Sequence, residues 1–193
     1  MSVESLGVTQ GEVRDRPFAV VTAACLCAMA VACTPAWREH VSPKGGFSVL
    51  MPDTPREERA LEETAAGRRE VVSLSAVLNR ELWFANRGFY FVAYADVSDN
   101  RAEGVSPERV LDDEREGAIK RLSGRLVREE AVRLDDHPGR EIEVATQAGL
   151  VRARIYLADR RVYHVVAGGG AEASSEDARR FFDSFKLLGV AGS

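Results

Sequence analysis

The sequence predicts one α+β domain built on a mainly antiparallel sheet of about six strands flanked by helices. Three observations predict it: segments in which apolar and polar residues alternate, helix signatures at residues 106–124 and 174–185, and the order strands, helix, four strands, helix. This order lacks the regular strand–helix alternation of parallel sheets, so the strands are expected to pair antiparallel. The composition, 45% hydrophobic and 29% charged, is typical of a folded globular protein and excludes a disordered chain.

Four segments in the first half of the chain are expected to be strands or strand edges. In residues 46–52, Phe47, Val49 and Met51 lie on one face of a strand, and Pro52 ends it because proline cannot donate a ladder hydrogen bond. Residues 56–69 are highly charged and are expected to form a strand edge or an exposed excursion. Residues 70–78 alternate again, whereas residues 88–97 are apolar on both faces. We therefore expect residues 88–97 to form a central strand that is covered on both sides.

Two helices are predicted from capping residues and from apolar side chains at helical spacing. Ser106 suits the N-cap of the first helix, Pro107 its first position, and Gly124 its end. Ser174 with Asp177 three residues later is an acidic variant of the capping box at the start of the second helix. The apolar faces of the two helices are formed by Val110, Leu111, Ala118, Ile119 and Leu122, and by Ala178, Phe181, Phe182 and Phe185.

Two hairpins are predicted between these helices. Residues 126–134 and 140–146 are joined through residues 135–139, whose aspartates, proline and glycine are typical of a turn. Residues 150–157 and 162–167 form the second hairpin. Strands joined by such short turns pair antiparallel, so these four segments extend the sheet.

The N-terminal segment is predicted to be an export signal. Residues 18–32 form an uncharged, apolar run that follows Arg14 and Arg16, the pattern of a secretory signal. The run ends in Ala30-Val31-Ala32-Cys33, which resembles the lipobox of bacterial lipoproteins. That resemblance implies that the cysteine carries the lipid, with palmitate as an expected acyl group, and becomes the mature N-terminus. It divides the chain into a signal peptide with a lipobox (1–32), a tether (33–45) and a single α+β domain (46–188).

This interpretation places the domain in the cell envelope, attached to the membrane through Cys33. In a bacterium with two membranes it would lie at the outer membrane or at the periplasmic face. Cys25 and Cys27 fall within the signal, so Cys33 is the one cysteine that follows it and has no partner for an intramolecular disulfide. Two alternatives stay open. Residues 18–37 carry no charge and are long enough for a single membrane span, or an ordinary signal peptidase releases a secreted domain.

Four short segments are similar to proteins of the PsbP/Mog1-like type. They are residues 46–55, 137–141, 154–157 and 180–187. The resemblance implies an antiparallel sheet sandwiched between helices, an α/β/α arrangement. It also implies the kinds of role that members of this fold have, as adaptors and as assembly factors for membrane complexes. It transfers no site residue, because proteins of one fold serve many functions.

The second hairpin carries a candidate ligand face, made of Arg152, Arg154, Tyr156 and His164. The first three residues alternate along one strand, and we expect the histidine to approach them from the neighbouring strand. Together they could hold an anionic ligand. The alternative is structural: the arginines pair across the sheet with Glu141 and Glu143, a common arrangement of small energetic value.

Trp83 and Phe84 are a candidate contact for a partner protein. These two large aromatic residues stand between charged residues and just before a predicted turn, which favours the surface. The alternative interpretation buries them in the core between two strands.

The sequence offers little for catalysis, cofactors or nucleic acid. Asp135, Asp136 and His137 could supply metal ligands, but the same residues suit a turn between strands. The nucleophile elbow and the P-loop lysine are missing from the sequence, and we expect no cofactor, no metal site and no catalytic residue. The net charge of −4 argues against a nucleic-acid partner.

These observations predict an exported lipoprotein with a non-catalytic binding domain that contacts the membrane through its lipid and another envelope protein or a small ligand through its fold. Two alternatives stay open. The first is an envelope hydrolase or metal-dependent enzyme that uses the polar face of the second hairpin. The second, implied by the resemblance alone, is an assembly factor for a membrane complex.

Overall fold

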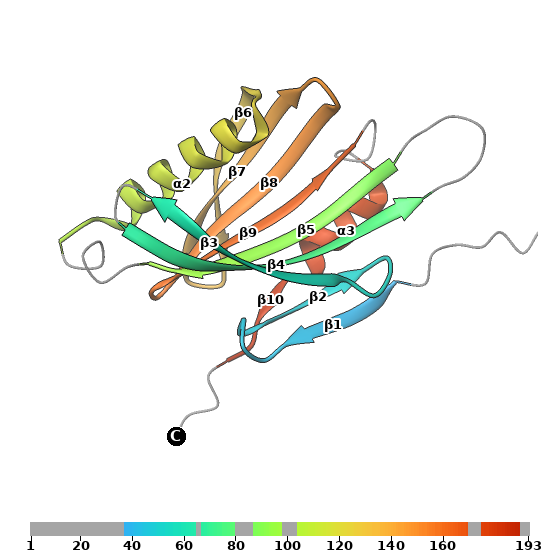
Figure 1. Cartoon of the computed structure of the whole chain (residues 1–193), viewed down its shortest axis with the longest axis horizontal. Helices are drawn as coiled ribbons and strands as arrows, with labels where there is room; N and C mark the ends of the chain where they lie inside the picture. The colour runs from blue at the N-terminus through green and yellow to red at the C-terminus, as the bar shows by residue number, and fades with distance from the viewer. Residues whose placement is uncertain (1–36, 65–66, 80–86, 98–103, 170–174, 190–193) are drawn as a thin grey trace, which may run out of the picture. The chain divides into compact units, whose positions relative to one another are not determined.

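The computed structural model describes residues 37–64, 67–79, 87–97, 104–169 and 175–189 (Figure 1). These residues form ten strands and two helices within one compact unit, Pro35–Ser193. No helix in this part of the chain is long and apolar enough to cross a membrane. The predicted signal peptide, residues 1–32, lies outside the described residues.

Seven strands form the larger of two sheets, here called the large sheet, and each pairs antiparallel with its neighbours. Across the sheet the order is β3 (Arg56–Thr64), β4 (Gly67–Asn79), β5 (Arg87–Asp96), β9 (Arg161–Gly168), β8 (Gly149–Ala158), β7 (His137–Thr146) and β6 (Arg125–Leu134). Most neighbours in the sheet are also consecutive in the chain. The exception is the pairing of β5 with β9, which joins the two halves of the domain.

Three strands form a separate small sheet: β1 (Arg38–Ser42), β2 (Phe47–Met51) and β10 (Lys186–Leu187). The central strand is β2, which pairs antiparallel with the other two. Its side chains Phe47, Val49 and Met51 are fully buried against one face of the large sheet. The small sheet therefore serves as a cover for that face.

Each helix packs on a different face of the large sheet, as Figure 1 shows. Helix α2 (Pro107–Leu122) begins at Ser106, whose hydroxyl accepts a hydrogen bond from the backbone N–H of Arg109. Helix α3 (Glu176–Ser184) is capped in the same way by Ser175. Both helices follow the serine N-cap rule, because a serine oxygen satisfies one of the free N–H groups of the first turn.

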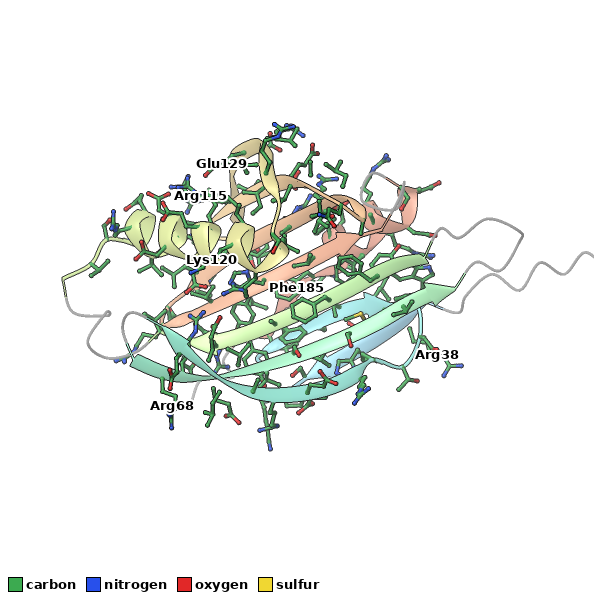
Figure 2. The ribbon with its side chains drawn as sticks, turned by 45° about the horizontal axis from the view of Figure 1, so that its top comes forward. Arg38, Arg68, Arg115, Lys120, Glu129 and Phe185 are labelled. Atoms are coloured by element: carbon green, nitrogen blue, oxygen red, sulfur yellow. The ribbon has the colours of Figure 1, made fainter. Side chains whose placement is uncertain are left out.

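The alternation of side chains along the strands divides the core into two parts. On β5, Tyr90, Val92 and Tyr94 point toward α3 and the small sheet, whereas Phe89 and Phe91 lie on the side of α2. This central strand is covered on both faces, as its two apolar faces predicted. Figure 2 labels Phe185, which follows α3. Its ring packs with Tyr156 and Tyr163 in the part of the core that faces α3 and the small sheet.

The structure confirms a mainly antiparallel α+β fold, with more strands than predicted. Residues 56–64, expected to be an edge or an excursion, form the full edge strand β3. Residues 38–42 of the predicted tether form β1, and residues 186–187 add β10. Strand β1 pairs with β2, the next segment of the chain, whereas the two-residue β10 pairs with β2 from the other end of the chain, which periodicity within one segment does not reveal.

Three predicted boundaries shift by a few residues. Ser175, not Ser174, caps α3. Ser123, not Gly124, takes the left-handed conformation that ends α2, with a φ of 48°. The first hairpin turns at residues 135–136 alone, with Asp135 at a φ of 52°, so that Gly139 belongs to strand β7.

Candidate functional site

A cavity of about 520 Å³ lies on the α2 side of the large sheet. Its lining comes from α2 and from β3, β4, β5, β8 and β9. Helix α2 packs mainly on β7 and β8, and the cavity lies beside it over β3, β4, β5 and β9. Strands lie about 4.8 Å apart, whereas one helix is only about 10 Å wide, so a single helix cannot cover a sheet of this width.

Most of the cavity wall is apolar. The sheet contributes side chains from its central strands, and α2 contributes side chains from its second half. Representative lining residues are Val71, Phe89, Phe91, Ala118, Leu122 and Val166. An apolar recess of this size falls within the range of about 300–1,000 Å³ that is typical of small-molecule sites.

The polar part of the wall is a chain of charged side chains. Arg69 of β4 is its centre: Nε and Nη2 lie 3.0 and 2.9 Å from Oε2 of Glu62 on β3, and Nη1 lies 2.7 Å from Oε1 of Glu114 on α2. Arg121 of α2 donates to Oε1 of Glu62 at 2.7 Å. His164 of β9 lies 3.1 Å from Oε2 of Glu114. Four of these residues line the cavity, and Glu114 lies behind them as the partner of Arg69 and His164. We call these five residues the charged wall.

Glu114 is the most deeply buried member of the charged wall, with a residue exposure of 4%. Burial by itself raises the pKa of its carboxyl group, but hydrogen bonds from His164 and Arg69, together with the charges of these two groups, lower the pKa well below its usual range. Glu114 therefore stays ionised in the folded protein. An ionised carboxylate whose two oxygens both accept hydrogen bonds fixes its partners in place and carries no proton to donate.

Of the charged wall, only His164 was a candidate from the sequence, although a signal for Glu114 was present. Glu114 interrupts the apolar face of the first predicted helix, between Leu111 and Ala118. A carboxylate at such a position has to find a cation inside the fold. Its partners Arg69 and His164 are 45 and 50 residues away in the chain, so their identity could not be read from spacing.

The predicted ligand face divides between the two faces of the sheet. Arg152, Arg154 and Tyr156 do share one face of β8, which lies toward α3. His164 lies on the opposite face, because the register pairs it with Ile155, whereas Arg154 pairs with Val165. The expectation that the histidine approaches the arginines was wrong. The short turn of the hairpin fixes this register, so the signal was already present in the sequence.

Arg152 and Arg154 form a packed structural cluster. Nε of Arg152 lies 2.8 Å and Nε of Arg154 2.6 Å from separate oxygens of Glu141, whose exposure is 3%. Both guanidinium groups also lie over the ring of Phe182, about 5 Å from its centroid. Tyr156 stacks on Phe185 with its ring buried. These contacts match the structural alternative, extended by the aromatic residues of α3.

A second hollow, of about 710 Å³, is lined by several cations at one end of β3, β4 and β5. Its arginines already have partners: Arg59 bonds Glu57 at 2.8 Å, and Arg161 bonds Asp96 at 2.6 Å. Their charges are balanced by these carboxylates. Most residues that line this hollow are charged, whereas most of those that line the cavity beside α2 are apolar, so the cavity beside α2 is the stronger candidate for a small-molecule site.

The remaining predicted site residues either lie outside the described residues or form a turn between two strands. Cys33, Trp83 and Phe84 lie outside the described residues. Asp135 and Asp136 form the turn between β6 and β7. Within the ranges that the structure describes, no group of three or more histidine, cysteine, aspartate or glutamate residues is placed to hold a metal ion.

No protein-family model and no curated protein sequence matches the chain. Among solved structures, the chain is similar to cyanobacterial PsbP (CyanoP) from Synechocystis sp. PCC 6803, with 10% sequence identity, a TM-score of 0.49 and coverage of 81% of this chain and 95% of that chain.

Proposed function

We propose that this protein is an exported, lipid-anchored envelope protein whose domain binds a small, mainly apolar molecule in the cavity beside α2. The observation that carries the proposal is the cavity itself: an apolar recess of about 520 Å³ with a charged wall. Few convergent polar groups in a mainly apolar recess are the usual arrangement of small-molecule sites.

The anchor in this proposal rests on the sequence. The apolar run of residues 18–32 ends in Ala30-Val31-Ala32-Cys33, the pattern that resembles a lipobox. A lipid at Cys33 would hold the domain at a membrane surface. A binding domain held there would meet apolar molecules that leave or enter the membrane.

The cavity wall favours binding over nucleophilic catalysis. Among the described residues that line it, the polar side chains are those of Glu62, Arg69, Arg121 and His164, and none is a serine, threonine, cysteine or lysine. The ring nitrogen Nε2 of His164 is occupied by Glu114. Covalent catalysis by a hydroxyl, thiol or amine needs such a nucleophile beside a free base, and the described residues of this wall include no such nucleophile.

The test is to fill the cavity and measure the binding of a neutral apolar dye, N-phenyl-1-naphthylamine, to the full chain by fluorescence. Val71 lines the cavity from β4, so Val71→Trp should weaken dye binding about tenfold or more, a loss of about 1.4 kcal/mol or more. Leu122→Trp should do the same from the α2 side.

Val77→Trp is the matched control. Val77 lies on the same strand and, by alternation, on the same face as Val71, but it is 54% exposed and outside the cavity. This variant should keep dye affinity within about twofold of wild type, while sharing any background binding by the rest of the chain. Equal effects of Val71→Trp and Val77→Trp on dye affinity would show that the dye does not bind in the cavity.

A further inference from the structure

The charged wall contains a carboxylate shared by two arginines. Oε2 of Glu62 accepts hydrogen bonds from Arg69 at 2.9 and 3.0 Å, and Oε1 accepts one from Arg121 at 2.7 Å. All three side chains line the cavity. Two guanidinium groups that converge on one carboxylate form a strong and geometrically specific carboxylate site.

The side chains of Arg69, Glu62 and Arg121 are restrained to different degrees by their burial and by their other contacts. Arg69 is only 13% exposed, and it is fixed independently by the buried carboxylate of Glu114. Glu62 is 28% exposed and belongs to β3, the edge strand of the large sheet. Within the described residues, its partner Arg121 is 47% exposed and forms its ion pair with Glu62 alone. Glu62 can therefore turn to solvent while Arg69 keeps its position.

The surroundings of the carboxylate site favour one kind of occupant. The cavity lining combines the cations Arg69 and Arg121 with apolar side chains such as Val71, which follows Arg69 on the same face of β4, and Phe91. A molecule that fits both needs a carboxylate at one end and a hydrocarbon chain at the other. A neutral chain would fit the apolar wall but would leave the arginines bonded to Glu62.

Resting on the proposed function, we propose that the ligand is an amphipathic monocarboxylate of the fatty-acid class and that Glu62 occupies the place of its carboxylate in the ligand-free protein. On binding, the ligand carboxylate replaces Glu62 on Arg69 and Arg121, and the Glu62 side chain moves into solvent. Glu62 thus acts as an internal competitor that the ligand has to displace.

The experiment compares dodecanoate with dodecanol as competitors of N-phenyl-1-naphthylamine on the full chain. The two compounds share a chain length and differ in the charged head group. Glu62→Gln removes the internal competitor and should raise the affinity for dodecanoate about fivefold, while the affinity for dodecanol stays within about twofold. Arg121→Gln should lower the affinity for dodecanoate about fivefold and leave dodecanol unchanged.

Glu63→Gln is the matched control, because the neighbouring Glu63 is 80% exposed and pairs with Arg68 outside the cavity. It should change neither affinity. Thermal unfolding of each variant checks that the fold is retained, which the exposure of Glu62 and Arg121 leads us to expect.

The outcomes separate the two proposals. Equal affinity for dodecanoate and dodecanol, with no effect of Glu62→Gln, would overturn the carboxylate site and leave the apolar cavity as the binding site. If neither compound displaces the dye and Val71→Trp does not change dye affinity, the proposed binding function of the cavity is wrong as well.

Discussion

Nη1 of Arg69 lies 2.7 Å from Oε1 of Glu114, an ion pair that joins β4 to α2 across the face of the large sheet. The two side chains are 13% and 5% exposed. Removing one partner of a buried ion pair leaves an uncompensated charge, which costs more than the pair gains when it forms. This contact therefore fixes α2 on the sheet and, with it, one wall of the cavity.

Glu114→Ala should lower the free energy of unfolding by about 3–5 kcal/mol, because Arg69 and His164 both lose their buried acceptor. Urea denaturation followed by circular dichroism measures this loss. Glu116→Ala on the same helix is the control, since Glu116 is 72% exposed, and it should change stability by no more than about 0.5 kcal/mol. Equal losses in the two variants would show that the ion pair does not hold the helix.

The stability of the protein should decrease in acid with a contribution from Glu114. Its pKa in the folded state is lower than its ordinary value of about 4.3, so its stabilising contribution is complete above that value and is lost as the pH falls below it. The pKa of Glu141 is also lowered: burial alone would raise it, but hydrogen bonds from Arg154 and Arg152 outweigh burial, so its contribution has the same sign.

Urea denaturation of wild type and Glu114→Gln between about pH 7 and about pH 3 tests this expectation. The wild-type free energy of unfolding should decrease below about pH 4.3, and the variant should decrease less steeply because one of the two lowered groups is gone. Glu116→Gln should give a curve parallel to the wild type. A curve for Glu114→Gln that is as steep as the wild-type curve would contradict the buried ion pairs.

Arg154→Lys tests the structural role of the predicted ligand face. Lysine keeps the charge but loses the planar fork that bonds Glu141 at 2.6 Å and Asp183 at 3.3 Å while lying over Phe182. We expect a loss of about 1.5–3 kcal/mol in the free energy of unfolding. Arg128→Lys, at a side chain that is 54% exposed, should be neutral. Dye binding in the cavity should be unchanged. A loss of dye affinity without a loss of stability would show that Arg154 takes part in ligand binding.

Gly139→Ala should destabilise the protein by about 1–3 kcal/mol. A Cβ atom at residue 139 would lie 2.5 Å from Cδ1 of Tyr156 and 2.6 Å from the carbonyl oxygen of Ile155, and neither neighbour can move away easily. Gly189→Ala is the control, because a Cβ there meets nothing within 4 Å. A melting temperature for Gly139→Ala equal to that of the control would refute this close packing.

Cys33→Ala should abolish the incorporation of radioactive palmitate into the protein in bacterial cells. The proposed lipobox makes Cys33 the acceptor, whereas the same proposal places Cys27 in the segment that cleavage would remove. Cys27→Ala should therefore keep the label. Loss of label in both variants, or in neither, would rule out lipidation at Cys33.

The sequence predicted the elements whose evidence is local. Residues 88–97 show two apolar faces, and β5 is covered on both sides. Ser106 and Pro107 predicted the start of α2, because a cap needs only the first turn of the helix. The two-residue strand β10 has no such local pattern, since it exists by pairing with the distant β2.

Gly139 shows how a correct prediction of a turn can carry an incorrect reason. The segment around it does reverse the chain, but the glycine stands in β7 and is required by the approach of Tyr156 from β8. Such a contact depends on the register of two strands. Backbone preferences of the residue alone could not reveal it.

What the sequence determined by itself was the antiparallel α+β class and the serine-capped start of α2, because each rests on short-range chemistry or periodicity. The tertiary structure decided which residues form the site. Glu114 finds Arg69 and His164 only when α2 packs on the sheet, and the cavity exists because one helix covers part of a broad sheet face. Contacts between residues far apart in the chain depend on strand register and on helix placement, and neither is encoded in any single segment.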